Sequence, residues 1–540
     1  MAFWNRSQLR AGALHWLLEL TWAGRTWRFA ESHLTANADG DGDKDWLEGL
    51  DAGPDVLDEM DAFSDSPEPR SMSLRVRFPP GVNVPVMVSE GHDLGSATAK
   101  VMLWLEGTTE AMIVLDGVVR DPSYATADDP VDFVAEELPF DDRALWPPVR
   151  AVVDSDTWPN AAAKAVDEMY PTVFGAPPLE HSDSFGSPGL VVNLAGTPPS
   201  TFDLLIAGHH VEGGTIAVRN TDDGTGDPTL TAVNTTDGDG MPCAIVDLVG
   251  SAVTLTDDGD KPYWVRWGTS TLTGGMVKPD GTLMRGAGDL LVWWLSRSTL
   301  RWDRGRVTTL VPRLNAFIID AALTVKAESR VSPWSWVSEH LLPYLPISAR
   351  VGPYGLYFAW YEYNAKAPDG VALINADNGT CERTSRVEYT SRDNVANEIR
   401  VSSRIDAESD TYRLTSIVTG SVETLATEGG AVVRHTLCER SEALYGRRIV
   451  EISADSISDE NTAGLVATWK ASALAMQHRL VSYNVPRDFA HLEPGNVVQI
   501  TDAGVNFSNT VALVESIPWG PSETFEIVLR VLSQGQEWST

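Results

Sequence analysis

The sequence predicts a mainly β, multidomain protein with a smaller α+β part. Its 540 residues are too many for a single core, so three or four domains are expected. Short strand patterns bounded by Gly, Pro and Asp recur along most of the chain. Helix signals are confined to residues 160–169, 288–295, 332–342 and 459–476.

Residues 1–177 are expected to form a first antiparallel β-barrel followed by a linker. Apolar residues alternate from Leu14 to Trp22, and Ala23-Gly24 then turns the chain back as a hairpin. Three further strands are expected, and Pro122 should end the last because proline cannot continue a central ladder. They cover residues 73–78, 99–105 and 111–119. The Pro- and Trp-rich residues 136–178 are interpreted as a linker that packs through its aromatic rings, with a short helix at 160–169.

Residues 178–275 are expected to form a separate β-rich, sandwich-like domain. They are rich in Gly, Asp and Thr, and short strand patterns follow one another at a spacing typical of a sandwich or barrel. The expected strands are 190–194, 203–207, 215–219, 229–233, 244–248 and 252–256.

The two remaining domains are a mixed α/β domain at 276–365 and a second β-barrel with one helix at 366–540. In the mixed domain, Ser332 and Pro333 mark a helix start as N-cap and first helical residue. The helix of the last domain should begin after Ser458 as N-cap. A stripe along that helix is predicted to be its packing face, and it comprises Leu465, Trp469, Ala473 and Met476.

Composition excludes several function classes. The chain has 41 basic and 75 acidic residues, a net charge of -34, which is opposite to what gripping nucleic acid through its phosphates requires. No segment approaches the roughly 20 apolar residues of a membrane helix, and the first 20 residues do not form a convincing signal peptide. Cys243, Cys381 and Cys438 are expected to be buried free thiols, because no two of them have metal-site or redox-motif spacing.

The 19 tryptophans favour large aromatic contacts between domains or subunits, although ordinary cores also use this residue.

One segment matches a calcium-loop pattern. Oxygen ligands fall at positions 1, 3, 5, 9 and 12 of a twelve-residue loop with Gly at position 6, as in an EF-hand. The residues are Asn37, Asp39, Asp41, Asp45 and Glu48. The first position is Asn rather than Asp, Lys44 stands where an apolar residue is usual, and the flanks read as strand and loop. We therefore favour a solvated acidic loop, and Ca²⁺ is the one cofactor that the sequence leaves open.

No catalytic constellation is visible, so the chain is not expected to be an enzyme. It has no nucleophile elbow, no HExxH spacing and no phosphate loop in a βαβ unit. His209 and His210 follow a predicted strand, where neighbouring side chains point to opposite faces, so structural roles are favoured over a shared metal.

An ordered set of segments resembles the tail-tip or baseplate hub proteins of tailed bacteriophages and gene transfer agents. The segments are residues 207–218, 289–303 with the later PWSWVSEHLLPYLP, 352–357 and 441–519. Within the last, Leu492-Glu493-Pro494-Gly495-Asn496-Val497-Val498 is similar to a family pattern that carries Asp where this chain has Asn496.

This resemblance implies a virion protein at the tail tip, made in the host cytoplasm. Hub subunits carry two tube-type β-barrels each, so three chains make a ring of six that joins a six-fold tail tube to a three-fold tip. The implied partners are two further copies and other tail proteins, with DNA passing through the ring unbound. A weak likeness between residues 112–122 and 510–521 agrees with two related barrels at the chain ends.

Two other hypotheses stay open: a receptor- or carbohydrate-binding tail-tip protein, and a secreted β-rich enzyme acting on glycans. The Trp content and the Asp-Gly loops favour them.

Overall fold

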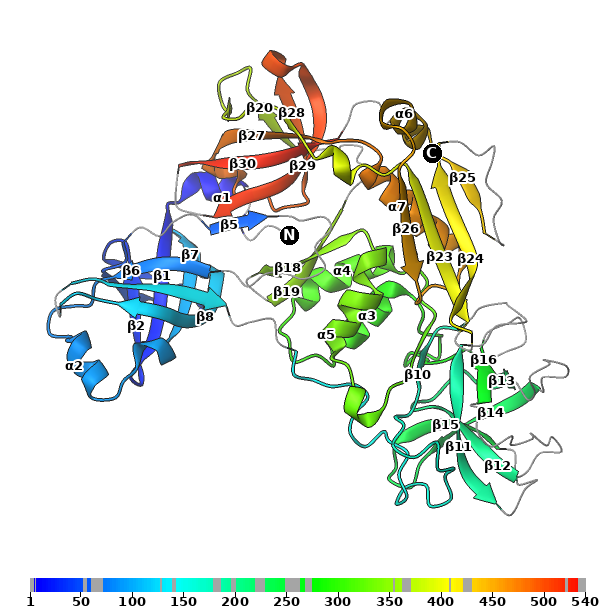
Figure 1. Cartoon of the computed structure of the whole chain (residues 1–540). Helices are drawn as coiled ribbons and strands as arrows, with labels where there is room; N and C mark the ends of the chain where they lie inside the picture. Colours follow the sequence, from blue (N-terminus) through cyan, green and yellow to red (C-terminus); the bar gives the residue numbers. More distant parts are fainter. Residues whose placement is uncertain are drawn as a thin grey trace.

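The structure is a computed structural model, and it confirms the mainly β, multidomain class. Two eight-stranded sheets, a four-stranded sheet and a closed barrel lie around a central group of helices (Figure 1). The described residues are 4, 6–51, 56–59, 71–126, 129–137, 142–177, 186–195, 201–218, 229–247, 263–267, 274–352, 355–361, 371–406, 409–420, 430–519 and 523–532. Among them, no helix is long and apolar enough to cross a bilayer.

The N-terminal sheet has eight strands in the order β3-β4-β2-β1-β7-β8-β9-β6. They are β1 (Leu14–Trp22), β2 (Arg25–Ala30), β3 (Leu34–Ala36), β4 (Lys44–Glu48), β6 (Ser71–Val76), β7 (Thr98–Leu105), β8 (Ala111–Ser123) and β9 (Val131–Glu137). The predicted hairpin at Ala23-Gly24 is confirmed. The predicted end at Pro122 is wrong: β8 continues to Ser123 through a bulge, with Asp121 at a φ of 49°. The bulge lets the strand accommodate the proline without an ordinary ladder bond.

A short segment after β4 joins the end strand β6 to β2, the third strand from the other end of this sheet. Gly49 N donates to Ala30 O of β2 at 3.1 Å, and Asp51 N donates to Arg75 O of β6 at 3.0 Å. Arg77 N in turn donates to Gly49 O at 2.7 Å. The sheet therefore curls until β2 and β6 are bridged by backbone hydrogen bonds. Only glycine fits at this bridge, because a Cβ on Gly49 would lie 2.3 Å from Arg77 O.

The C-terminal sheet also has eight strands, one of them supplied by the N-terminal part of the chain. Six follow the order β20-β28-β29-β30-β27-β21, β22 pairs with β27, and β5 (Val56–Glu59) pairs with the end of β29. The others are β20 (Ala372–Asn375), β21 (Glu382–Arg383), β22 (Glu388–Tyr389), β27 (Arg479–Pro486), β28 (Val497–Asp502), β29 (Phe507–Trp519) and β30 (Thr524–Val531). One continuous cluster of buried apolar side chains runs through both eight-stranded sheets.

The middle of the chain forms a closed six-stranded barrel in the order β11-β12-β15-β14-β13-β16, the second of the two architectures, sandwich or barrel, that the strand spacing left open. Its strands are β11 (Ser187–Ala195), β12 (Thr201–Ala207), β13 (Gly214–Val218), β14 (Thr229–Thr236), β15 (Pro242–Asp247) and β16 (Tyr263–Arg266). Alternation alone does not separate the two architectures, because both bury one face of each strand. The strand expected at 252–256 lies outside the described residues.

Residues 160–169 do not form the expected helix but run as turns against the outside of this barrel. The indole of Trp158 donates to Tyr170 Oη at 2.8 Å, and that hydroxyl donates to Asp237 at 2.8 Å. The prediction that residues 136–178 pack through their aromatic rings is thus confirmed at Trp158 and Tyr170.

The helical unit contains both helices predicted between 276 and 365. It consists of α3 (Ala287–Leu295), α4 (Arg304–Leu314), α5 (Pro333–His340), β18 (Ile347–Gly352) and β19 (Gly355–Trp360). Ser332 caps α5, as predicted, by accepting from Ser335 N.

A four-stranded sheet with two helices lies inside the region expected to be one barrel with one helix. It has the order β25-β24-β23-β26. Its elements are β23 (Glu398–Asp406), β24 (Thr411–Thr419), β25 (Val432–Arg434), α6 (Thr436–Tyr445), β26 (Ile449–Ala454) and α7 (Glu460–Leu474). It shares one core with the helical unit.

Helix α7 differs in two details from its prediction. Its N-cap is Asp459 rather than Ser458, since the Asp459 carboxylate accepts from Thr462 N. Leu465 of the predicted stripe is 39% exposed, whereas Val466 and Trp469 are buried. The buried face is wider than one stripe because the helix is covered on both flanks by the core that it shares with the helical unit.

Two glycine substitutions test the sheet closure. Gly49→Ala should lower the stability of the N-terminal sheet by about 1–3 kcal/mol, because the new methyl group overlaps a carbonyl oxygen at the bridge. In α7, a Cβ on Gly464 meets nothing within 4 Å, so Gly464→Ala should raise stability by about 0.5–1 kcal/mol. Calorimetric unfolding of both variants measures these changes, and equal effects of the two would contradict the bridge.

Candidate functional site

The calcium-loop residues lie on a β-hairpin rather than between helices. Asp45 and Glu48 belong to strand β4, and the loop joins β3 to β4. Asn37 accepts from Gly42 N at 3.3 Å, and Asp39 forms an ion pair with Lys44, which lowers the pKa of Asp39. These bonds engage the side-chain oxygens of Asn37 and Asp39, which are two of the five candidate calcium ligands. Within the described residues, no three His, Cys, Asp or Glu side chains are placed to share a metal ion.

The two histidines act as a backbone clasp. His209 Nε2 accepts from Val173 N at 2.9 Å, so the proton is on Nδ1, which donates to His210 O at 3.0 Å. Burial lowers the pKa of His209 to about 4, so this ring is neutral at pH 7. The clasp joins β12 of the barrel to β10 (Thr172–Phe174), which pairs with β17 (Ala321–Leu323) beside the helical unit.

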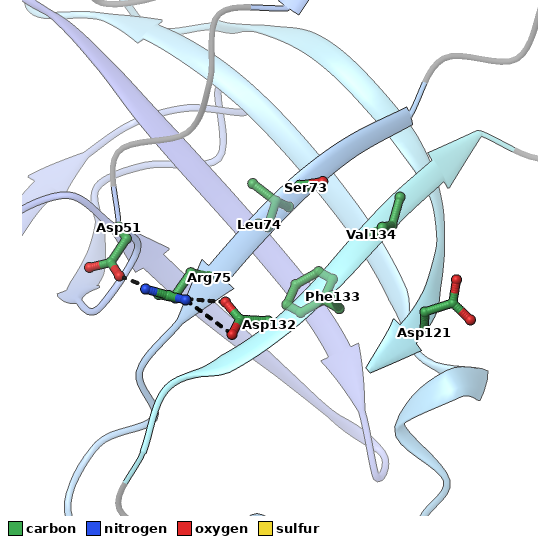
Figure 2. Close-up of a pocket in the computed structure, with 8 residues that line it drawn as sticks. All are labelled: Asp51, Ser73, Leu74, Arg75, Asp121, Asp132, Phe133 and Val134. Atoms are coloured by element: carbon green, nitrogen blue, oxygen red, sulfur yellow. Dashed lines mark hydrogen bonds and ion pairs between the residues drawn. The ribbon is translucent and has the colours of Figure 1, made fainter. Parts of the chain in front are cut away.

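A shallow hollow on the N-terminal sheet contains four charged side chains (Figure 2). It is lined by Asp51, Ser73, Leu74, Arg75, Asp121, Asp132, Phe133 and Val134. Arg75 lies 2.6 Å from Asp132 and 3.9 Å from Asp51, and its hydrogen bond lowers the pKa of the Asp132 carboxyl. The hollow carries one cation and three carboxylates, of which Arg75 pairs with two, and it contains no nucleophile with a neighbouring base.

Two buried polar groups beside the barrel, Asp237 and Cys243, have structural rather than reactive character. Asp237 closes the turn between β14 and β15 by accepting from Asp239 N and Met241 N. Burial raises the pKa of the adjacent Cys243 thiol to about 12, so the thiol is protonated and unreactive. All three cysteines are free and buried, as predicted.

The tryptophans are used inside the chain. Of the 17 whose burial is described, 13 are buried and four partly buried. A group of them joins α3 to α5 and to the segment before the barrel: Trp294 stacks on Trp336 at 4.7 Å, and Trp146 meets Trp293 edge-on at 5.0 Å. The prediction of aromatic contacts therefore applies to contacts between parts of one chain, and no described tryptophan is exposed enough to serve as a platform for a sugar ring.

The segment Leu492–Val498 forms a tight turn that joins the C-terminal sheet to the helical unit. Gly495 has a φ of 86°, and Asn496 N donates to Glu493 O at 3.0 Å. Pro494 and Gly495 thus occupy the central positions of a type II turn, which needs positive φ at the second. The side-chain oxygen of Asn496 accepts from Glu493 N at 3.0 Å. An Asp carboxylate at this position can accept the same bond, so Asn and Asp suit the turn equally.

Glu493 is held by α4. The two terminal nitrogens of the Arg306 guanidinium, Nη1 and Nη2, donate to the Glu493 carboxylate at 3.2 and 2.7 Å. The guanidinium also lies 4.4 Å from the Tyr357 ring centroid. The two side chains are 19% and 15% exposed. A bidentate pair of this kind fixes both distance and angle between the elements that carry it.

A second joint surrounds Asp320, which is 1% exposed. Its carboxylate accepts from Ala176 N at 2.8 Å and from Arg285 at 3.1 and 3.2 Å. Burial nevertheless raises the pKa of Asp320. Its own backbone N donates to Ser456 O at 2.9 Å, close to the start of α7. Segments before the barrel, in the helical unit and before α7 therefore meet at one carboxylate.

Two contacts join the N-terminal and C-terminal sheets. Helix α1 (Arg6–Ala11) docks on the short 3₁₀ helix η5 (Arg487–Phe489), where Arg10 reaches the buried Asp488 at 2.6 Å. Strand β5 pairs antiparallel with Ser516–Trp519 of β29. Neither contact has a signal in the sequence, because each joins residues more than 450 positions apart. The joints can fix the relative placement of the sheets, and they provide no chemistry for catalysis.

Comparison with solved structures gives neighbours that include two tail proteins and a chain of a gene transfer agent virion. No protein-family model and no curated protein sequence matches the chain. A tail protein from Neisseria meningitidis MC58 is 11% identical with a TM-score of 0.35, over 96% of this chain and 97% of that chain. The 43 kDa tail protein of prophage MuSo2 from Shewanella oneidensis is 9% identical with a TM-score of 0.34, over 96% and 98%. A chain of the native gene transfer agent virion is 12% identical with a TM-score of 0.19, over 49% and 84%.

Glu493→Gln should weaken the joint between the C-terminal sheet and α4. It removes the bidentate partner of Arg306 in a mostly buried position and leaves the Asp303 carboxylate, 3.4 Å from Nε, as the remaining countercharge, so we expect a loss on the order of 1–2 kcal/mol in unfolding free energy. The matched control is Glu523→Gln, because Glu523 pairs with Arg487 but is 83% exposed, and we expect less than about 0.5 kcal/mol there. Denaturant unfolding measures both, and similar small losses would contradict the joint.

The His209 clasp predicts a pH-dependent stability. Since the folded pKa is depressed, the unfolded state takes up the proton first, so the clasp contributes fully above about pH 6.5 and is lost as pH falls toward about 4. His209→Gln should flatten the dependence of stability on pH in that window. His210→Gln replaces an exposed neighbour and should leave the dependence unchanged; thermal unfolding from pH 7 to 4 compares the three proteins. An unaltered slope in His209→Gln would exclude the clasp as its cause.

Proposed function

We propose that the chain is a structural virion protein: a tail-tip or baseplate hub subunit that forms a trimeric ring between a six-fold tail tube and a three-fold tip and surrounds the DNA channel. One observation carries the proposal. The chain holds two eight-stranded sheets side by side through α1, β5 and a common core. Three such chains present six comparable sheets, which is what a ring matching six-fold to three-fold symmetry requires.

The two sheets share features of construction beyond strand number. Each centres on a strand of 13 residues, β8 or β29, that pairs antiparallel on both sides and carries a register shift. Each also receives one parallel strand, β4 on β2 and β20 on β28. Strand β8 includes all of the first of the two weakly similar segments, and β29 includes residues 510–519 of the second, which supports a relation between the sheets.

The charge of the chain agrees with a passage for DNA. A net charge of -34 repels phosphates and leaves DNA without the cationic contacts that would retain it. The proposed partners are accordingly two further copies and neighbouring tail proteins, and the role assigned is structural rather than enzymatic.

Cryo-EM of the intact particle tests this function. The expected result is density for this chain on the tail axis at the tip, with three copies and six curled sheets around a channel. A position outside the tail axis, or a number of copies other than three, would overturn the proposal.

A further inference from the structure

Strand β26 presents an open edge. It ends the four-stranded sheet, and no other described strand lies beside it. Arg448 O accepts from Asn397 N at 2.9 Å and from Glu398 N at 3.0 Å, so Arg448 faces inward to β23. Successive residues of a strand turn their N–H and C=O groups to opposite sides. The backbone groups of Ile449 and Glu451 therefore face outward, and no described residue bonds to them.

The next outward residue confirms this alternation. Ser453 O accepts from Tyr344 Oη at 2.9 Å, which comes from outside the sheet. Ile449, Glu451 and Ser453 are all exposed, with Ile449 at 44%. An exposed strand with unpaired backbone groups is a template for another strand unless bulges, proline or charged side chains protect it; β26 has no bulge or proline, and its one charged residue, Glu451, is paired with Arg400 at 3.2 Å.

The rim of this edge combines arginine with apolar side chains. Leu444, at the end of α6, is 62% exposed. Arg392 lies 5.3 Å from the Tyr445 ring centroid, and Arg448 donates to Arg392 O at 2.7 Å. Arg440, one helical turn before Leu444, is exposed and forms no ion pair with any described residue. Arginine and tyrosine beside exposed aliphatic groups are the residue types enriched at protein interfaces.

A complementary edge exists elsewhere on the chain. Strand β3 ends the N-terminal sheet and has a neighbour only in β4. It leads into the acidic loop Asn37–Asp43, in which Asp41 and Asp43 are exposed and, unlike Asp39, have no cation partner among the described residues. One edge thus carries free arginine and the other carries free carboxylates.

We propose that β26 of one copy pairs with β3 of a second copy, with Arg440 and Arg448 facing Asp41 and Asp43. The proposal deepens the proposed function and rests on it, because it names the contact between neighbouring copies. The two edges lie on different parts of the chain, so the contact is heterologous, and repetition around an axis closes a ring. The segment that binds β26 is an extended strand, since an added strand bonds to the two N–H and two C=O groups of Ile449 and Glu451 that face outward.

A proline at position 451 tests the edge without breaking the sheet. Because the N–H of Glu451 faces outward, Glu451→Pro removes a donor only from the open edge. Glu451→Gln is the matched control, since it also loses the ion pair with Arg400 but keeps the N–H. In light scattering and native mass spectrometry, Glu451→Pro should weaken association of copies at least about tenfold relative to Glu451→Gln at equal thermal stability. Equal association of the two variants would overturn the proposal.

Charge reversal tests the partner edge independently of proline. Arg440→Glu should weaken association, and combining it with Asp41→Lys and Asp43→Lys should restore it. Failure of the combined variant to recover would overturn the assignment of β3. If the purified chain is monomeric and Glu451→Pro only loses incorporation into particles, another tail protein occupies β26 and the second-copy proposal is wrong. Intact rings in particles made with Glu451→Pro would overturn this contact while leaving the hub function in place.

Discussion

The contact between Arg10 and Asp488 constrains most of the architecture. The Asp488 side chain is 8% exposed, and a carboxylate buried to that degree is costly unless a cation or hydrogen-bond donors compensate it. Arg10 supplies two contacts, at 2.8 and 2.6 Å, across 478 positions of sequence. Arg10 itself is 64% exposed, so solvent screens the pair, and its contribution is to orient helix α1 against η5 just before β1 begins. Strand β5 adds a second tie, and the apolar core then runs through both sheets without interruption.

Local rules predict local elements well in this chain. The hairpin at Ala23-Gly24 and the start of α5 at Ser332 depend on turn and capping chemistry within a few residues, and both are found where the sequence placed them. The ties that define the architecture have no such signal. Strand β5 is four residues long and pairs with a strand of another sheet, so neither its length nor its neighbours in sequence identify its partner. Sequence patterns also do not separate the four-stranded sheet from the β-barrel expected at 366–540, because its strands have the same alternation as those on either side.

The residues of the candidate site likewise divide into those whose role the sequence predicts and those whose role depends on distant residues. The Asp-Gly spacing of residues 37–48 matches ligand types but not their context, because the structure places strands where an EF-hand has helices. The turn at Pro494-Gly495 was predictable from its residues, whereas the role of Glu493 depends on Arg306, which is 187 positions away. Tryptophan content indicated large aromatic contacts but could not distinguish one chain's interior from a subunit interface, since both bury indole rings.

The joints share a chemical type that bears on their role. Asp488, Glu493 and Asp320 are carboxylates held by arginine from another part of the chain. Replacing such pairs by apolar residues is often neutral for stability, whereas removing one partner is costly. Their contribution is therefore better understood as orientation than as added stability, because an incorrectly docked unit leaves a buried charge unpaired. A subunit that must present two sheets at a fixed angle needs joints that disfavour incorrect docking. A purely apolar joint tolerates sliding and does not provide this.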